Sequence, residues 1–351
     1  MLALRALGLG DALTGAPALR GLRRARPDHL LVLAGPPGPG ELLRRRGVVD
    51  RVLPVEGVRA LEEAAVVDAV RAHPDVLPPG PCVDLAANLH GRGPQSARAL
   101  RALLGERGAR DAQLLGHRCP AAGLEDGPAW DEEADEVGRW VRLVDAAGGP
   151  CSAADLLLPP VTGTPGGAEA GAGAPVAPDP APGGAVVLHP GAASGSRRWP
   201  VERWAALAAR LLADGRRVVL TGGAAEAGLT GDVARATGTA ADGRLVDLAG
   251  RCDLEELAAL LTAARALVCG DTGVAHLGTA LRTPSVLLFG PTSPAAWGPA
   301  VDRHLHTVLW PAPAASYRGD PHGAATDPVL ARTGVDDVLA ALHALPPRPR
   351  G

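Results

Sequence analysis

Lysine is absent from this sequence of 351 residues, so arginine is its principal basic residue. Without lysine the chain cannot form a GxxxxGK[ST] phosphate-binding loop. The formal net charge of -3 removes the electrostatic basis for nonspecific nucleic-acid binding, although short arginine clusters such as Arg44 to Arg46 occur. We therefore expect no nucleic-acid partner.

Long apolar runs are also missing, because none reaches the roughly 18 residues that a membrane-spanning helix needs. The N-terminus lacks the charged start and the small-residue cleavage site of a signal peptide. The cysteines show no CxxC spacing, which argues against a zinc site and a disulfide framework; they are Cys82, Cys119, Cys151, Cys252 and Cys269. We expect a cytoplasmic protein with reduced thiols, and leave open a peripheral contact with a membrane.

Short apolar runs alternate with segments of helical period along the whole chain. The expected strands are MLALRAL, HLLVLAG, RVLPV, PCVDLAANLHG, AVVLHPG, RRVVLTGG, RALVCG and PSVLLFG. The expected helices cover residues 12–25, 40–47, 200–215, 253–264 and 334–345, and another helix follows Glu226. This alternation predicts an α/β fold with mostly parallel sheets.

Residues 161–184 are dominated by Pro, Gly and Ala and show no apolar period, which is typical of a linker. The length of the chain suits two domains of roughly 150 residues. We therefore predict one α/β domain at 1–160 and a second at 185–320. A C-terminal helix and tail would follow at 321–351.

Four loops follow the carboxyl ends of expected strands, where open parallel sheets bind their ligands. They run from Gly8 to Asp11, from His189 to Trp199, from Gly222 to Glu226 and from Asp271 to His276. Their grouping favours one ligand cleft. LGLGD, the first of them, does not have the GxGxxG spacing of a dinucleotide site, and Asp11 on its own would be a helix-capping acid.

The loop HPGAASGSRRWP combines small residues with hydroxyl donors at Ser194 and Ser196 and cations at Arg197 and Arg198. Arginine binds phosphate through two parallel hydrogen bonds, so this mixture suits a phosphate or pyrophosphate. The alternative is a surface turn in front of a helix that starts at Pro200.

In GDTGVAHLGTAL, Thr272 is a suitable N-cap, and Gly273 would begin a helix whose free amides attract an anion. The alternative reading makes Asp271 a structural turn acid and His276 a buried core histidine.

The motifs LGDALTGAPALRGLRRARP, HPGAASGSRRWPVERWAALAARL, VVLTGGAAE and CGDTGVAHLGTALRTPSVLLFGPTSPAAWGP occur in this order. Together they resemble glycosyltransferase family 9, the heptosyltransferase-like enzymes. The resemblance implies a GT-B architecture of two Rossmann-like, doubly wound domains that face each other across a cleft. It also implies inverting sugar transfer from a nucleotide-diphosphate donor, usually ADP-heptose, without a cofactor or a protein-bound metal. The acceptor would be a glycan, a lipid-linked glycan or a small molecule.

Carried onto this sequence, the resemblance makes Asp11 the general base and Glu226 a contact of the nucleotide ribose. Arg197 stands where the family usually has lysine, which keeps the cation and changes its geometry. The sugar and diphosphate end would comprise Asp271, Thr272, Gly273 and His276, with Ser194, Ser196 and Arg198 in the donor loop. A nucleotide-sugar epimerase, a catalytically silent nucleotide-sugar-binding protein and a nicotinamide-dependent oxidoreductase are the rival readings.

Overall fold

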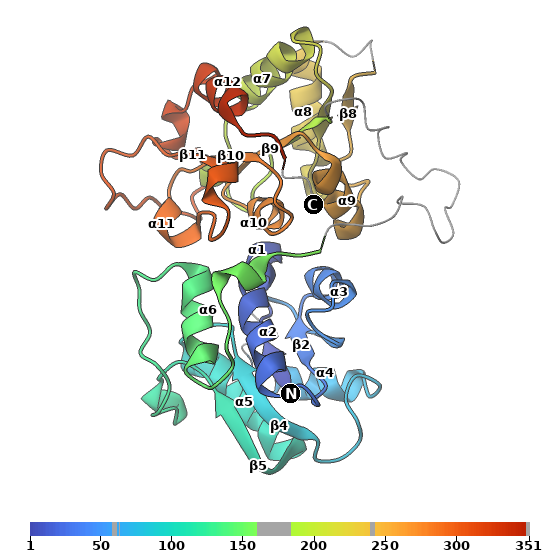
Figure 1. Cartoon of the computed structure of the whole chain (residues 1–351), viewed down its shortest axis with the longest axis vertical. Helices are drawn as coiled ribbons and strands as arrows, with labels where there is room; N and C mark the ends of the chain where they lie inside the picture. The colour runs from blue at the N-terminus through green and yellow to red at the C-terminus, as the bar shows by residue number, and fades with distance from the viewer. Residues whose placement is uncertain (58–61, 63, 160–183, 239–242, 349–351) are drawn as a thin grey trace. The chain divides into compact units, whose positions relative to one another are not determined.

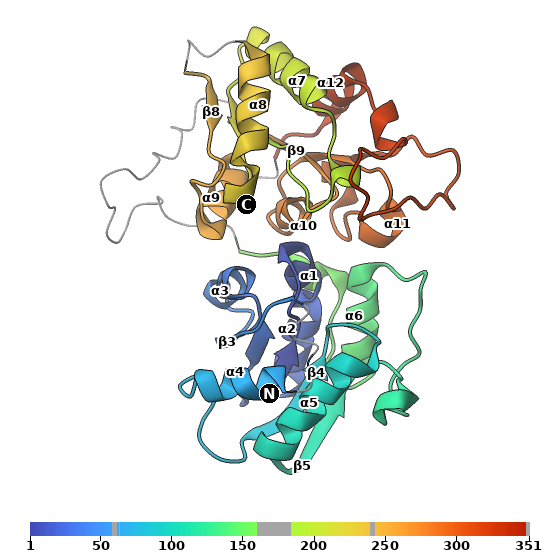
Figure 2. The same cartoon turned by 180° about the vertical axis from the view of Figure 1, so that it is seen from behind.

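The computed structural model describes residues 1–57, 62, 64–159, 184–238 and 243–348 (Figures 1 and 2). The chain divides into two compact units, Met1–Leu156 and Leu157–Gly351. Each unit is built on one parallel sheet. The α/β fold that the sequence predicts is therefore confirmed.

The sheet of the first unit has the order β3-β2-β1-β4-β5. Its strands are β1 (Leu2–Leu4), β2 (Val32–Gly35), β3 (Arg51–Pro54), β4 (Val83–Asn88) and β5 (Gly108–Leu115). The first four coincide with apolar runs in the sequence. The sequence analysis missed β5, because GARDAQLL is an edge strand with exposed Arg110 and Asp111 and lacks an apolar run.

The helices of the first unit are α1 (Leu9–Thr14), α2 (Ala16–Ala25), α3 (Pro37–Arg45), α4 (Ala65–Ala72), α5 (Pro94–Arg107) and α6 (Glu136–Asp145). Figures 1 and 2 show α2 and α6 side by side on one face of the sheet, with α4 and α5 on the other. The prediction of one helix over 12–25 is wrong. The helix is broken at Gly15, after which Pro17 lies in the first turn of α2, where a missing amide does no harm.

The sheet of the second unit has the order β11-β10-β9-β6-β7-β8. Its strands are β6 (Val186–His189), β7 (Val218–Leu220), β8 (Leu245–Asp247), β9 (Ala266–Gly270), β10 (Ser285–Leu288) and β11 (His306–Leu309). If β6 is counted as the first strand and β11 as the sixth, this is the six-stranded Rossmann order 3-2-1-4-5-6. The short, half-buried strands β8 and β11 carry too few apolar residues to be recognised from sequence.

The helices of the second unit are α7 (Val201–Ala213), α8 (Ala227–Thr237), α9 (Leu254–Ala263), α10 (Gly273–Ala280), α11 (Pro294–Trp297) and α12 (Val335–Ala344). In α12, Val338 and Leu342 are buried in the same core as Trp204 and Val286. Residues 334–345 therefore do form a helix, and it completes the second core. None of the helices in the described ranges is long and apolar enough to cross a membrane.

The predicted linker at 161–184 lies outside the described residues except for Gly184. The domain boundaries at 160 and 185 stay predictions.

Candidate functional site

In the second unit the strand order reverses between β6 and β9, and the two loops that leave these strands touch. The carbonyl oxygen of Arg197 lies 2.9 Å from the position that a Cβ on Gly270 would occupy, so glycine permits this close approach. Arg197 Nη1 also donates to the carbonyl oxygen of Asp271 at 3.4 Å. The structure thus brings together the loops 189–199 and 271–276 at a switch point, where sheets of this order bind ligands.

The two adjacent arginines of this loop have different surroundings. Arg198 Nε and Nη2 both donate to the carbonyl oxygen of Ala192, at 2.9 and 2.7 Å, which closes the loop on itself. Arg197 Nε is buried and has no hydrogen-bond partner within the described part of the chain. Arg198 is therefore occupied by its own loop, whereas Arg197 retains donor capacity for a ligand.

Asp271 directly follows β9 and is buried, with 5% of its surface exposed. Thr292 Oγ1 donates to its Oδ2 at 2.6 Å. Thr272 is the N-cap of α10, as expected, with an extended backbone (φ -145°), although its side chain makes no capping bond. Helix geometry leaves the amides of Gly273 and Val274 without an acceptor inside the helix, which gives this end a partial positive charge.

His276 lies one turn into α10 and is buried, and its ring packs edge-on against Trp297 with centroids 6.1 Å apart.

The loop after β7 brings Glu226 to the end of β6. Its Oε2 accepts from the amide of Gly223 at 2.8 Å. Its Oε1 lies 2.0 Å from the position of a Cβ on Gly191, so only glycine at 191 leaves room for this carboxylate. His189 at the end of β6 is buried with its Nδ1 3.0 Å from Thr221 Oγ1. Burial lowers the pKa of His189, and the charge of Glu226 opposes this effect.

Ser196 is buried under a segment that the sequence analysis missed, residues 319–327. The Ser196 amide donates to the carbonyl of Gly323 at 2.9 Å, and its own carbonyl accepts from the amide of Asp327 at 3.1 Å. A Cβ on Gly195 would lie 1.8 Å from the carbonyl oxygen of Ala324. The segment has no apolar period, so only the density of glycine in both stretches could have signalled this close packing.

Ser194 is half-buried, and its carbonyl oxygen accepts from the Arg197 amide at 3.2 Å. The predicted serine donors therefore occupy different environments. The Ser196 hydroxyl is buried without a hydrogen-bond partner among the described residues.

In the first unit the strand order reverses between β1 and β4, and Asp11 follows β1 as the third residue of α1. The N-cap of α1 is Gly8, and the helix has no side-chain capping bond. The Asp11 carboxylate, 28% exposed, is instead paired with Arg5, whose Nη2 lies 3.3 Å from Asp11 Oδ1. A capping role does not describe this side chain.

Arg5 is the main residue of this site that the sequence analysis missed. It is 1% exposed, and its Nε and Nη1 donate to the carbonyl oxygens of Asp11 (2.6 Å) and Leu89 (2.5 Å). Its Nη2 also donates to Thr14 Oγ1 (3.1 Å) and to Glu136 Oε1 (2.8 Å). A lone cation inside the apolar run MLALRAL was the available signal.

His90 follows β4 and accepts from the amide of Ala6 through Nδ1 at 3.2 Å. Burial, and to a lesser extent the charge of Arg5, lower the pKa of His90 to about 4. The switch point of the first unit therefore holds a neutral histidine, a buried guanidinium and the Asp11 carboxylate at neutral pH.

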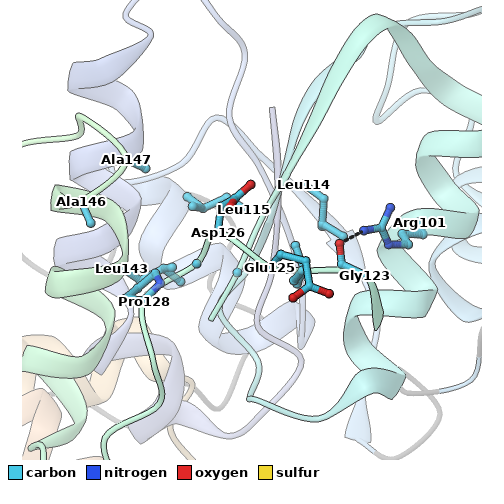
Figure 3. A pocket seen from close by; sticks show the side chains of 13 residues that line it. Arg101, Leu114, Leu115, Gly123, Glu125, Asp126, Pro128, Leu143, Ala146 and Ala147 are labelled. Atoms are coloured by element: carbon cyan, nitrogen blue, oxygen red, sulfur yellow. Dashed lines mark hydrogen bonds between the residues drawn. The ribbon is translucent and has the colours of Figure 1, made fainter. Parts of the chain in front are cut away.

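The first unit also contains a cavity of about 370 Å³ beside β5 (Figure 3). Leu115, Asp126 and Leu143 are among its lining residues, and Arg101 at its rim donates to the carbonyl of Gly123 at 2.7 Å. None of the predicted site residues lines it. Within the described ranges, no group of three or more His, Cys, Asp or Glu residues could hold a metal ion.

By sequence, known proteins match part of the chain. Residues 166–318 match the sequence model of glycosyltransferase family 9 (heptosyltransferase). The chain is 37% identical over 106 residues to lipopolysaccharide heptosyltransferase 2 of Escherichia coli. The matched residues make up 30% of this chain and 30% of that protein. It is 40% identical over 114 residues to lipopolysaccharide heptosyltransferase 1 of Pseudomonas aeruginosa, 32% of this chain and 30% of that protein. The chain thus matches about 30% of the length of these relatives.

Solved structures resemble the chain over nearly its whole length. The ADP-heptose LPS heptosyltransferase II of Escherichia coli has a TM-score of 0.71 at 24% identity, covering 98% of this chain and 97% of its own. A family 9 glycosyltransferase of Veillonella parvula has a TM-score of 0.74 at 17% identity, with coverages of 97% and 96%. An Escherichia coli heptosyltransferase solved with ADP has a TM-score of 0.66 at 21% identity, with coverages of 97% and 98%. These likenesses show the shared fold.

Proposed function

We propose that this chain is a member of glycosyltransferase family 9 and that it transfers a sugar with inversion from a nucleotide-diphosphate donor to an acceptor hydroxyl. The observation that carries the proposal is the switch point of the second unit. There Arg197, with a buried and unpartnered Nε, meets the start of α10. A cation and free helix amides suit a diphosphate.

The leaving nucleoside diphosphate develops negative charge as the bond to the sugar breaks. Arg197 and the amides of Gly273 and Val274 are proposed to stabilise that charge. Glu226, held over Gly191, is proposed to bind the ribose hydroxyls, because a carboxylate accepts hydrogen bonds from both. Asp271, already bonded to Thr292, and His276 are proposed to line the sugar end, with Ser194 and Ser196 as hydroxyl donors.

Asp11 is proposed as the general base that takes the proton of the attacking acceptor hydroxyl. Its carboxylate is accessible, and its orientation is fixed by a buried cation, Arg5. A base of this kind contributes about 10²- to 10⁴-fold to the rate.

ADP-heptose is the proposed donor, because one relative is named as an ADP-heptose enzyme and another was solved with ADP. The acceptor is proposed to be a glycan, a lipid-linked glycan or a small molecule, reached in the cytoplasm, with peripheral membrane contact if it is lipid-linked.

The transfer is proposed to need no protein-bound metal, since Arg197 and the α10 amides supply positive charge at the leaving group. Turnover that survives exhaustive chelation supports this part, and loss that is restored by a divalent cation contradicts it.

The test of the function is product formation. The purified protein is given ADP-heptose with a panel of hydroxyl acceptors, and ADP release and the mass and anomeric configuration of the product are measured. Transfer with inverted configuration supports the proposal. Conversion of the donor to an epimer without an acceptor would identify the rival epimerase activity, and binding without either reaction would identify a silent binding protein.

A further inference from the structure

The proposed base, Asp11, belongs to a chain of buried charges that reaches into α6. Arg5 Nη2 contacts Asp11 Oδ1 on one side and Glu136 Oε1 on the other, at 3.3 and 2.8 Å. Glu136 is the first residue of α6 and is itself buried. Since both carboxylate oxygens contact the same nitrogen, they lie within about 6 Å of each other.

Glu136 uses both of its oxygens. Oε1 accepts from Arg5 and from Trp140 Nε1, the latter at 2.8 Å. Oε2 accepts from Arg139 Nη1, and Arg139 is also buried. The Arg5 guanidinium lies over the Trp140 ring, 4.6 Å from its centroid. Three donors thus fix the orientation of Glu136, and its Oε1 faces Arg5.

We propose that Glu136 is a positioning residue for the base: through Arg5 it fixes the Asp11 carboxylate and shares the positive charge that this carboxylate faces. The inference rests on the proposed function of Asp11. Without Glu136, Arg5 would keep Asp11 as its only carboxylate partner among the described residues. A carboxylate is a weaker base when it faces a cation that no second carboxylate shares. A weaker base removes a proton less effectively.

The ionisable groups around these buried charges come from several elements. Arg5 follows β1, His90 follows β4, and Glu136 and Arg139 belong to α6. His117, which packs edge-on against Trp140, has its pKa lowered mainly by burial. On α3, which contacts α1, Glu41 is held by Arg44 and Arg45 with a pKa of about 2. His90, with a pKa of about 4, therefore titrates in the range of an ordinary carboxyl group.

Glu136→Gln tests the inference, because it keeps the size of the side chain and removes its charge. The rate of sugar transfer is measured as a function of pH, and the Asp11 carboxyl carbon is titrated by ¹³C NMR, assigned by its loss in Asp11→Asn. The NMR readout separates Asp11 from His90 and needs no turnover. We expect both midpoints to fall by about one pH unit, because a charge within 6 Å is removed, and turnover at the plateau to fall about three- to tenfold.

Three variants complete the design. Glu136→Asp keeps the charge and should keep the wild-type midpoints. Arg139→Gln removes the second arginine that is hydrogen-bonded to Glu136, so the midpoints of the pH–rate profile and of the Asp11 titration should move to higher pH. Glu132→Gln is the matched control. Glu132 lies in the loop before α6, and its exposed carboxylate is paired with Arg92, so the substitution should change neither midpoint.

A purely structural Glu136 would lower the melting temperature and the turnover of Glu136→Gln and leave both midpoints unchanged, and that result overturns the inference. If Glu136→Gln does not fold, Arg139→Gln decides: no shift, or a shift to lower pH, overturns it equally. If the wild-type protein transfers no sugar, the proposed function fails, and the NMR midpoints still report whether Glu136 acts on Asp11.

Discussion

The contrast between Arg197 and Arg198 gives the sharpest test of the donor site. Both are arginines of one short loop, so replacing either by alanine removes the same charge and nearly the same surface. Their side chains have different partners: Arg198 donates two hydrogen bonds to the Ala192 carbonyl, whereas Arg197 has one long contact of 3.4 Å and a buried Nε without a partner among the described residues. A ligand anion can therefore bond to Arg197 without breaking the loop.

The magnitude follows from the type of bond. A hydrogen bond to a charged partner contributes about 1.5 to 3 kcal/mol. Arg197→Ala should therefore weaken ADP binding about 10- to 150-fold, since 1.4 kcal/mol corresponds to a factor of ten. Arg197 loses only one weak protein contact, so the melting temperature should change little. Arg198→Ala should show the reverse pattern. The melting temperature should fall, because the loop loses the two hydrogen bonds from Arg198 to the Ala192 carbonyl, and the ADP affinity should stay within about fivefold of wild type.

Isothermal titration of the full chain with ADP, beside thermal unfolding of the same samples, measures both quantities. Arg197→Lys is the informative third variant. It restores the cation as a point charge without the planar fork, so it should recover most of the affinity that alanine loses. Wild-type affinity in Arg197→Ala, or a greater loss in a well-folded Arg198→Ala, would refute the assignment of this loop to the diphosphate.

Three further predictions concern other positions. Asp11→Asn should lower turnover about 10²- to 10⁴-fold and leave ADP affinity unchanged in calorimetry, and near-wild-type turnover would reject Asp11 as the base. Gly191→Ala places a methyl group 2.0 Å from Glu226 Oε1, so it should displace that carboxylate and weaken ADP binding, which unaltered titrations would contradict. The pKa of His306 is lowered to about 4 by burial, and its Nε2 has no partner within the described residues. Between pH 6.5 and 4 the unfolded chain therefore binds more protons at this site, and stability should fall by up to about 3 kcal/mol as the pH is lowered through that window. Melting curves against pH should be flatter in His306→Gln, and an identical slope would refute the contribution.

The sequence predicts those parts of the fold that carry a local signal. Apolar runs such as AVVLHPG and RALVCG become central strands, because a strand buried on both faces needs apolar residues throughout. Edge strands need them less, which is why β5, with Arg110 and Asp111, was missed. The break at Gly15 between α1 and α2 was missed as well, since glycine is tolerated in a helical pattern and the decision depends on packing.

The candidate site divides in the same way. The loops that follow strands could be predicted, because parallel strands end at one edge of a sheet and the chemistry of the loops is visible in their residues. Arg5 and Glu136 are separated by 131 positions in the sequence, and their contact exists only once α6 packs onto the first sheet. The contact of residues 319–327 with the loop at Gly195 is likewise tertiary.

The two units share the order of their five core strands, so the fold cannot assign one of them to the donor. The charged groups at the two switch points do distinguish the units. In the first unit the Arg5 guanidinium at the switch point is buried and bonded on every nitrogen, and the accessible group is the Asp11 carboxylate. In the second unit the carboxylate of Asp271 is turned inward to Thr292, and Arg197 keeps donor capacity beside the amides of α10. A diphosphate would be repelled at the first and attracted at the second. We therefore infer that the donor binds the second unit and that the first unit supplies the base.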